Sequence, residues 1–349
     1  MKRFFGCLIF LMLLVAAARC ETLTLSFIGD CSTGEMAQSV GKAGSYTAVL
    51  DEKGFDWPFS LVREYLESDD FTFANCEVVF TNRTRHQDKK TNLKAAPQYA
   101  EVLLHSGIDA VNTANNHAMD FFMEGYDDTL SALDAFGVPH FGSLYADTKR
   151  ARDTLGVYEV KGVKLGVMGF SYPQDSDLAR IRARIDALHE QGCALVIVSL
   201  HWGREVQSSP QKWQFTYAQK VLDAGADVIW GHHPHILQQV QFYQGKPIFF
   251  STGNFTFGSM SNVDPDTGIF QLCYQLTDDA PVLDSFRVIP CRTQGKGDFR
   301  PYPLTDPVEK AAMLRKLIYG KTVKGMQNLP ASFAQSGVVR LIDGRLPEE

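Results

Sequence analysis

Short apolar runs rich in β-branched residues alternate along this chain with helix-like segments, and this alternation is the feature that most constrains the fold. Seven runs are predicted to be strands, at residues 23–30, 71–77, 109–117, 164–171, 194–203, 227–235 and 247–255. Several intervening segments end on glycine, as helix carboxyl ends often do, at Gly107, Gly137, Gly192 and Gly225. Strand–helix alternation predicts a layered α/β domain with parallel neighbouring strands.

Six of the predicted strands end in side chains that can ligate a metal ion. These side chains are Asp30, Glu77, Asn116 and His117, His201, the run His232, His233 and His235, and Asn254. In an α/β sheet, the crevice outside the carboxyl ends of the strands is where ligands bind. We therefore expect carboxylate, amide and imidazole groups to meet at one edge of the sheet.

The donor atoms in this set are oxygen and imidazole nitrogen, without the Cys-x-x-Cys spacing of thiolate sites. Such a set suits Mn, Fe, Zn or Mg and does not distinguish among them. The donors outnumber the four ligands of a tetrahedral site, so the pattern predicts two divalent ions. Paired ions of this kind activate water near neutral pH and stabilise an in-line displacement.

The same residues lie in stretches that resemble the bacterial capsule-synthesis family (CapA/PgsA, poly-γ-glutamate biosynthesis), whose domain is similar to the calcineurin-type metallophosphoesterases. The stretches follow the family's order over about residues 22–305: "FIGDCSTGEM", "NCEVVF", "NTANNHAMDF", "LHWGREVQSSP", "GADVIWGHHPHILQ" and "FSTGNFTFG". The resemblance implies a four-layer α/β sandwich, with mixed sheets flanked by helices. It also implies a role in making an extracellular anionic polymer.

The resemblance further implies which residue binds which ion. The first ion would be bound by Asp30 and His235, and Glu77 would bridge it to the second. The second ion would be bound by Asn116, His201 and His233. His232 is expected to point away, because neighbouring residues of an extended chain face opposite sides.

Other site residues follow from the same resemblance. His117 would act on the substrate as proton donor or transition-state stabiliser, and Glu205 and Asn254 would line the same pocket. The wider phosphoesterase pattern begins Asp-x-His, whereas Ser32 stands at the histidine position here. The bridging position holds Glu77 rather than aspartate, so one first-metal ligand is missing and another is changed.

A basic segment, residues 81–94, follows the strand that carries Glu77. One interpretation is a solvated loop. The other is that it overhangs the site, with Arg83 and Arg85 binding an anionic substrate and supplying a positive field. The net charge of −6 disfavours general nucleic-acid binding.

The amino-terminal residues have the pattern of an export signal. Lys2 and Arg3 precede an apolar run and small residues. We expect a signal peptide or N-terminal anchor over 1–20, with a lipoprotein as an alternative, then one domain over 21–325 and a loose tail over 326–349. The chain is thus expected outside the cytoplasm, secreted, periplasmic or membrane-anchored.

Three functions remain open from the sequence. The first is synthesis or processing of poly-γ-glutamate or another capsule polymer, in contact with a membrane-bound synthesis complex. The second is a metal-dependent hydrolase of phosphoesters or of the polymer. The third is a non-catalytic polymer-binding or assembly subunit. His117 favours catalysis, and the missing first-motif histidine favours the third.

Overall fold

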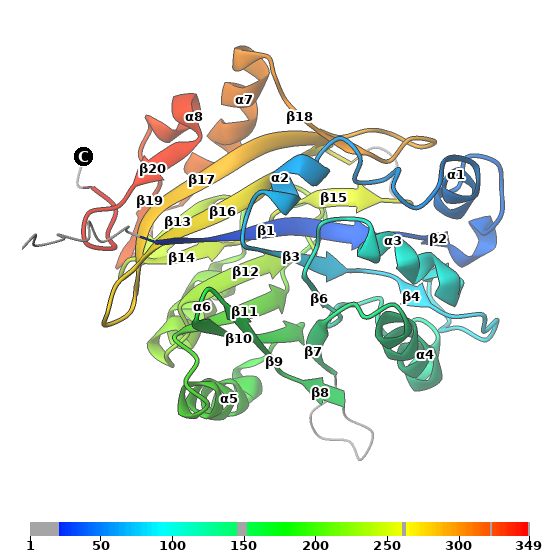
Figure 1. Ribbon diagram of the computed structural model, residues 1–349, viewed down its shortest axis with the longest axis horizontal. Coiled ribbons are helices and arrows are strands. Elements are labelled where there is room, and N and C mark those ends of the chain that lie inside the picture. The colour runs from blue at the N-terminus through cyan, green and yellow to red at the C-terminus, as the bar shows by residue number, and fades with distance from the viewer. Residues whose placement is uncertain (1–20, 145–151, 260–262, 322, 348–349) are drawn as a thin grey trace, which may run out of the picture.

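Strand β1 (Thr22–Ser32) lies at the centre of the first of two β-sheets that pack face to face (Figure 1). The computed structural model describes residues 21–144, 152–259, 263–321 and 323–347. The expected signal peptide or anchor over 1–20 therefore lies outside the described residues. Within the described ranges, no helix has both the length and the apolar character needed to cross a membrane.

The first sheet is mixed. Parallel to β1 run β3 (Phe71–Cys76), β6 (Ala110–Asn112) and β15 (Asn254–Phe257). Strand β16 (Asp266–Leu276) is antiparallel to β1, and β17 (Pro281–Thr293) is antiparallel to β16. Two short strands pair with β17, β18 (Pro301–Pro303) and β20 (Val338–Arg340). The parallel pairing places the carboxyl ends of β1, β3 and β6 at one edge.

The second sheet has a parallel centre of β10 (Val163–Ser171), β11 (Leu195–His201), β12 (Val228–His232) and β14 (Lys246–Phe249). Strand β9 (Gly156–Val160) pairs antiparallel with β10, β13 (Val240–Tyr243) with β14, and β19 (Met326–Asn328) with β13. Strand β7 (His140–Leu144) pairs with both β6 and β10, and also with β8 (Arg152–Thr154), so the hydrogen bonding continues across 17 strands. A separate small sheet consists of β2 (Glu35–Met36), β5 (Leu93–Ala95) and β4 (Val79–Phe80).

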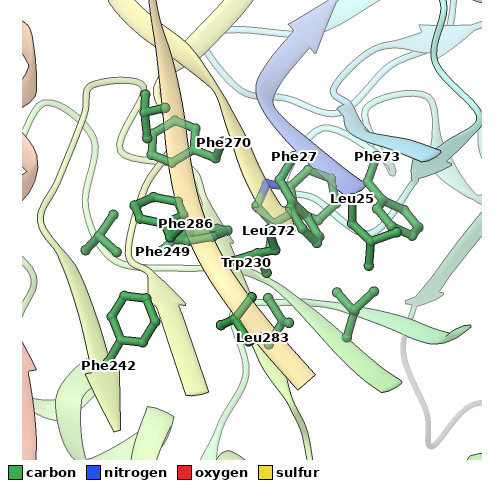
Figure 2. Close-up of a cluster of buried hydrophobic side chains, with 14 of the residues drawn as sticks. Leu25, Phe27, Phe73, Trp230, Phe242, Phe249, Phe270, Leu272, Leu283 and Phe286 are labelled. Atoms are coloured by element: carbon green, nitrogen blue, oxygen red, sulfur yellow. The ribbon is translucent and has the colours of Figure 1, made fainter. Parts of the chain in front are cut away.

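Aromatic side chains fill the space between the two sheets (Figure 2). The ring of Phe27 on β1 lies 5.3 Å from that of Phe73, and 5.7 Å from those of Trp230 and Phe249 on the second sheet. Alternate residues of β1 face this core and the opposite layer, so that Ile28 packs among the outer residues. Burial of these side chains determines which face of each sheet packs against the other.

Helices cover both outer faces. The first sheet is covered by α1 (Tyr46–Lys53), α2 (Arg63–Glu67), α3 (Glu101–Leu104) and α4 (Phe122–Ala135). The second is covered by α5 (Leu178–Glu190) and α6 (Lys212–Asp223). The layers thus run helices, sheet, sheet, helices, which is the expected four-layer α/β arrangement.

The carboxyl-terminal segment differs from the expected loose tail. After α7 (Pro307–Ile318), strand β19 pairs with β13, helix α8 (Phe333–Ser336) follows, and β20 pairs with β17. The Phe333 ring stacks on Phe286 at 5.4 Å and belongs to the inter-sheet core. The buried apolar residues Phe333, Val339 and Leu341 hold the segment against the rest of the domain.

We expect Phe333→Ala to lower the free energy of unfolding by about 3–5 kcal/mol, because a fully buried ring is lost and a cavity remains. Urea denaturation measures this change. The exposed neighbour Gln335 provides the control, and Gln335→Ala should shift stability by less than about 0.5 kcal/mol. Equal stability of the two variants would show that the segment is not part of the folded core.

Candidate metal centre

The predicted strand ends meet at one edge of the molecule. Asp30 lies near the end of β1, Glu77 follows β3, His117 lies in the turn after β6, and His201 ends β11. The histidine run follows β12, and Asn254 begins β15. All of these side chains are buried, Asn116 beside them is half-buried, and Glu205 is exposed.

The run predicted as one strand over 247–255 is in fact two strands in different sheets. Strand β14 pairs with β12 in the second sheet, and β15 pairs with β1 in the first, where Asn254 lies opposite Asp30. The chain crosses at Gly253, whose φ of 71° favours glycine. A Cβ on Gly29 would lie 2.0 Å from the Gly253 oxygen, so the crossing also needs glycine in β1. These two glycines allow both sheets to reach the site.

Asp30 is held by donors from both sheets. The Asn75 Nδ2 donates to Asp30 Oδ1 at 2.7 Å, and the backbone N–H of His233 donates to Oδ2 at 3.3 Å. His235 Nδ1 lies 3.2 Å from Oδ2. Burial alone would raise the pKa of Asp30, but His232 and His235 hold that pKa well below its usual range. Asp30 is therefore a buried carboxylate that carries its charge.

Glu77 Oε1 is buried and has no hydrogen-bond partner in the described part of the chain. The Nε2 atoms of His117, His201 and His235 surround it at 3.9, 3.8 and 3.8 Å. Burial, and then the charge of Asp30, raise the pKa of Glu77 well above its ordinary value. Ligands about 2.1 Å from one ion lie roughly 3–4 Å apart, so these gaps fit a divalent cation, which would also offset the charge repulsion.

A second pair of donor atoms meets nearby. His201 Nε2 and Asn116 Oδ1 are 2.9 Å apart, a separation that two ligands of one ion also show. Burial, with the neighbouring His233, lowers the pKa of His201 well below its ordinary value. A neutral imidazole is the form that binds metal.

The histidine run turns sharply. His233 and His235 both have positive φ, 95° and 59°, which is unusual for residues other than glycine. Burial and the neighbouring His235 lower the pKa of His233 to about 3, so its ring is neutral. His233 Nδ1 is buried and lacks a hydrogen-bond partner among the residues described.

His232 does not lie outside the site, contrary to our expectation. It faces away from His233, but that side is the space between the sheets, where its Nδ1 lies 3.4 Å from Asp30 Oδ1. Its ring packs on Trp230 with centroids 4.1 Å apart. Asp30 belongs to the opposing sheet and lies against the face of β12 that carries His232. Alternation within one strand cannot predict a contact with another sheet.

Close-set groups of ligand atoms occur twice in the described chain. Asp30, Glu77 and His235 form one group, and Glu205, His233 and His235 the other, with the ligand atoms of each group within 4.8 Å of one another. His235 belongs to both. The Asn254 Oδ1 lies 2.9 Å from His235 Nδ1 and orients that ring.

His117 is buried beside this cluster and is oriented by a carboxylate. Its Nδ1 lies 2.8 Å from Oδ2 of the buried Asp120, and Lys89 Nζ contacts the other oxygen of Asp120. Burial lowers the pKa of His117, against the opposite effect of Asp120. Sequence reasoning missed Asp120, although a carboxylate three residues after a histidine in a turn was available as a signal.

Tyr172 is another residue that sequence reasoning missed. It follows β10, and its hydroxyl lies 3.0 Å from His233 Nε2. Burial, with the charges of Glu205 and Glu77, raises the pKa of Tyr172 to about 12, so the phenol keeps its proton. This contact leaves Nδ1 as the ring nitrogen of His233 that is free to bind an ion.

We expect Tyr172→Phe to weaken binding of Mn²⁺ or Zn²⁺ by about tenfold, because the partner that orients a ligating imidazole is lost. Isothermal titration calorimetry measures the affinity. Tyr319→Phe, at a residue that is 71% exposed, is the matched control and should leave it unchanged. Equal affinity of both variants would remove Tyr172 from the site.

A cleft of about 510 Å³ opens onto the cluster and is lined in part by His117, His235, Glu205, Lys89 and Lys90. Ions bound at the cluster would therefore be accessible to substrate. The lysines give its mouth positive charge.

The structure does not place Arg83 and Arg85 in this cleft. The Arg83 guanidinium pairs with Asp128 on α4 through bonds of 2.8 and 3.0 Å. Arg85 lies over the ring of Phe122, 4.6 Å from its centroid. Both partners lie on α4, so the arginines are engaged outside the cleft, and their predicted role in substrate binding stays a prediction. Lys89 and Lys90 of the same segment line the cleft instead.

Comparison with known proteins confirms the family resemblance. The model of the family described as "Bacterial capsule synthesis protein PGA_cap" matches residues 24–259. The PGA biosynthesis protein CapA of Bacillus subtilis (strain 168) is 29% identical over 252 residues, which cover 68% of this chain and 64% of that protein. The capsule biosynthesis protein CapA of Bacillus anthracis is 30% identical over 324 residues, covering 85% of this chain and 73% of that protein. The chain thus spans just under two thirds of the B. subtilis relative.

Similar solved structures come from Thermus thermophilus. The sulfate thiohydrolase SoxB matches with a TM-score of 0.48 and 13% identity, covering 84% of this chain and 59% of that one. A 5'-nucleotidase precursor matches with a TM-score of 0.41 and 13% identity, covering 82% and 55%. Both similarities are weak in sequence and in geometry, and no property of either protein is transferred to this chain.

Proposed function

The chain belongs to the bacterial capsule synthesis protein family PGA_cap, and from this premise we propose that it processes an anionic capsule polymer through a metal-dependent hydrolytic site. Poly-γ-glutamate is the proposed polymer, because two relatives are named for PGA or capsule biosynthesis. The substrate class, the reaction and the partners are all parts of this proposal.

The observation that carries the proposal is the environment of Glu77 Oε1. A buried carboxylate oxygen without a hydrogen-bond partner in the described structure, surrounded by three imidazole nitrogens, is costly unless a cation shares it. Asp30, Glu77, Asn116, His201, His233 and His235 would hold two ions. Divalent ions there supply Lewis-acid polarisation and make water more acidic.

The residues around the ligands have separate tasks in this proposal. His117 is within reach of the cleft and is oriented by Asp120, which suits it to exchange a proton with the reacting groups or to stabilise the transition state. Lys89 and Lys90 attract acidic groups to the mouth of the cleft. The buried ring of His201 and the neutral ring of His233 stay unprotonated.

We further propose that the protein works outside the cytoplasm, beside a membrane-bound polymer synthesis complex. The basis for this location is the amino-terminal pattern of Lys2 and Arg3 followed by an apolar run. Acidic polymers and phosphoesters are the candidate ligands. The acidic net charge of −6 disfavours nucleic acid.

One observation favours a second candidate function, that of a non-catalytic assembly subunit. Ser32 stands where the wider phosphoesterase pattern has a ligating histidine, and its hydroxyl oxygen is buried without a hydrogen-bond partner among the described residues. The first ion would then be held by fewer side chains.

Turnover assays on the purified protein separate these functions. The protein is treated with chelator, reloaded with Mn²⁺ or Zn²⁺, and incubated with poly-γ-glutamate and with a chromogenic phosphodiester. Metal-dependent shortening of the polymer supports the proposal. Cleavage of the phosphodiester alone would mean that the substrate is a phosphoester and not the polymer. If ions bind and neither compound is cleaved, the assembly subunit is the better description.

A further inference from the structure

We propose that the cleft at the metal centre continues into a second pocket, which binds a further carboxylate of an extended polyanion such as poly-γ-glutamate. This inference rests on the proposed function. It adds the path of the polymer across the surface and the dependence of its affinity on length. The residues concerned are Lys42 and Lys296, which belong to neither candidate ion site.

The two pockets adjoin because they share lining residues. The second pocket, of about 150 Å³, is lined by Met36 and Ser259, which also line the main cleft. Its far side is formed by Lys42, Lys296 and Ser39. The two adjacent pockets therefore place Lys90 beside the cluster at one end and Lys42 and Lys296 at the other, and we refer to them together as the groove.

The lysines along this groove lack acidic partners. Lys42, Lys90 and Lys296 form no ion pair with any carboxylate in the described ranges. Some lysines elsewhere are paired, including Lys161 with Asp70, Lys220 with Asp175, and Lys246 with Asp227. Lys164 and Lys324 are exposed and have no ion pair in the described ranges, but they line neither pocket. An unpaired lysine can bind an incoming anion without giving up an existing ion pair. On a chain of net charge −6, such positions select where a polyanion approaches.

The carboxylate of Glu35 also lines the second pocket, but it does not prevent the lysines from binding an anion. Glu35 is 1% exposed, and its oxygens accept hydrogen bonds from Thr47 N at 3.0 Å and Thr47 Oγ1 at 2.5 Å. Its acceptor capacity is directed to α1. The lysines are exposed and can bend toward a ligand.

A polymer with regularly spaced carboxylates can contact both ends of the groove, whereas a short fragment can contact one. Linking two weak contacts in one ligand raises affinity without any new contact type. The groove therefore predicts that affinity increases with polymer length, and that the increase depends on Lys42 and Lys296.

Fluorescence anisotropy tests this with labelled γ-glutamyl oligomers of two and of ten residues. The double variant Lys42→Glu/Lys296→Glu should bind the ten-residue oligomer about tenfold more weakly at low salt and the two-residue oligomer as wild type does. The control Lys164→Glu/Lys324→Glu makes the same change in net charge at exposed lysines outside both pockets, and should bind both as wild type does.

The outcomes separate the inference from the proposed function. If wild type binds the long oligomer and the double variant is unchanged, or falls only as far as the control, the second pocket is refuted while the proposed polymer stands. If wild type binds neither oligomer, the proposed polymer itself is refuted and the pocket with it.

Discussion

His235→Ala is expected to lower the affinity of the protein for Mn²⁺ or Zn²⁺ by at least about 100-fold. His235 is the residue shared by both groups of ligand atoms, and it lies 3.2 Å from Asp30 and 3.8 Å from Glu77. Its loss removes a ligand from each group, which should exceed the 10–100-fold effect of losing an outer-shell partner. Calorimetric titration of chelator-treated protein measures the affinity.

The control for this variant is His140→Ala, since His140 is half-buried and outside both groups. His235→Gln is measured beside it, because it keeps volume and leaves the backbone less disturbed. Circular dichroism establishes that each variant is folded. Wild-type affinity in a folded His235→Ala protein would show that the cluster does not bind metal.

His117→Asn is expected to reduce turnover by about 10²–10⁴-fold with the same number of bound ions. This is the usual range for loss of a positioned proton donor. His117 Nε2 is 3.9 Å from Glu77 Oε1 and faces the cleft, and its Nδ1 is held by Asp120. Steady-state rates of metal-loaded protein, with elemental analysis of the same samples, measure both quantities.

Asp120→Asn separates positioning from direct action. The amide keeps the shape but loses the charge that orients His117, so turnover should fall less than in His117→Asn. If the His117→Asn rate is within about threefold of wild type, His117 takes no part in the reaction. If the His117→Asn protein loses bound ions as well as turnover, His117 has a role in metal binding instead.

The sequence was sufficient for the layers and for most of the cluster. Alternating strands and helices predicted a layered α/β domain, because each strand and helix must bury its apolar face against another layer. The four-layer sandwich was implied by the family resemblance. Asp30, Glu77 and His201 could be placed together because parallel strands end at a common edge. That reasoning needs only the order of strands and the residue after each.

Residues that approach from the opposing sheet or from loops could not be predicted this way. His232 contacts Asp30 across two sheets, and Tyr172 reaches His233 from a turn with positive φ. Arg83 was assigned to the substrate by charge alone, while its partner Asp128 lies 45 positions further along the chain. The segment containing Phe333 was expected to be a loose tail, and its packing on Phe286 depends on a contact between residues far apart in the sequence.

Equilibrium dialysis of chelator-treated wild-type protein against Mn²⁺ or Zn²⁺, followed by elemental analysis, tests the central claim most directly. The buried Glu77 oxygen, the charged Asp30 and the neutral imidazoles of His201 and His233 predict saturable binding of two ions per chain. A folded protein that retains no ion after dialysis would contradict the metal centre and the hydrolytic function proposed from it.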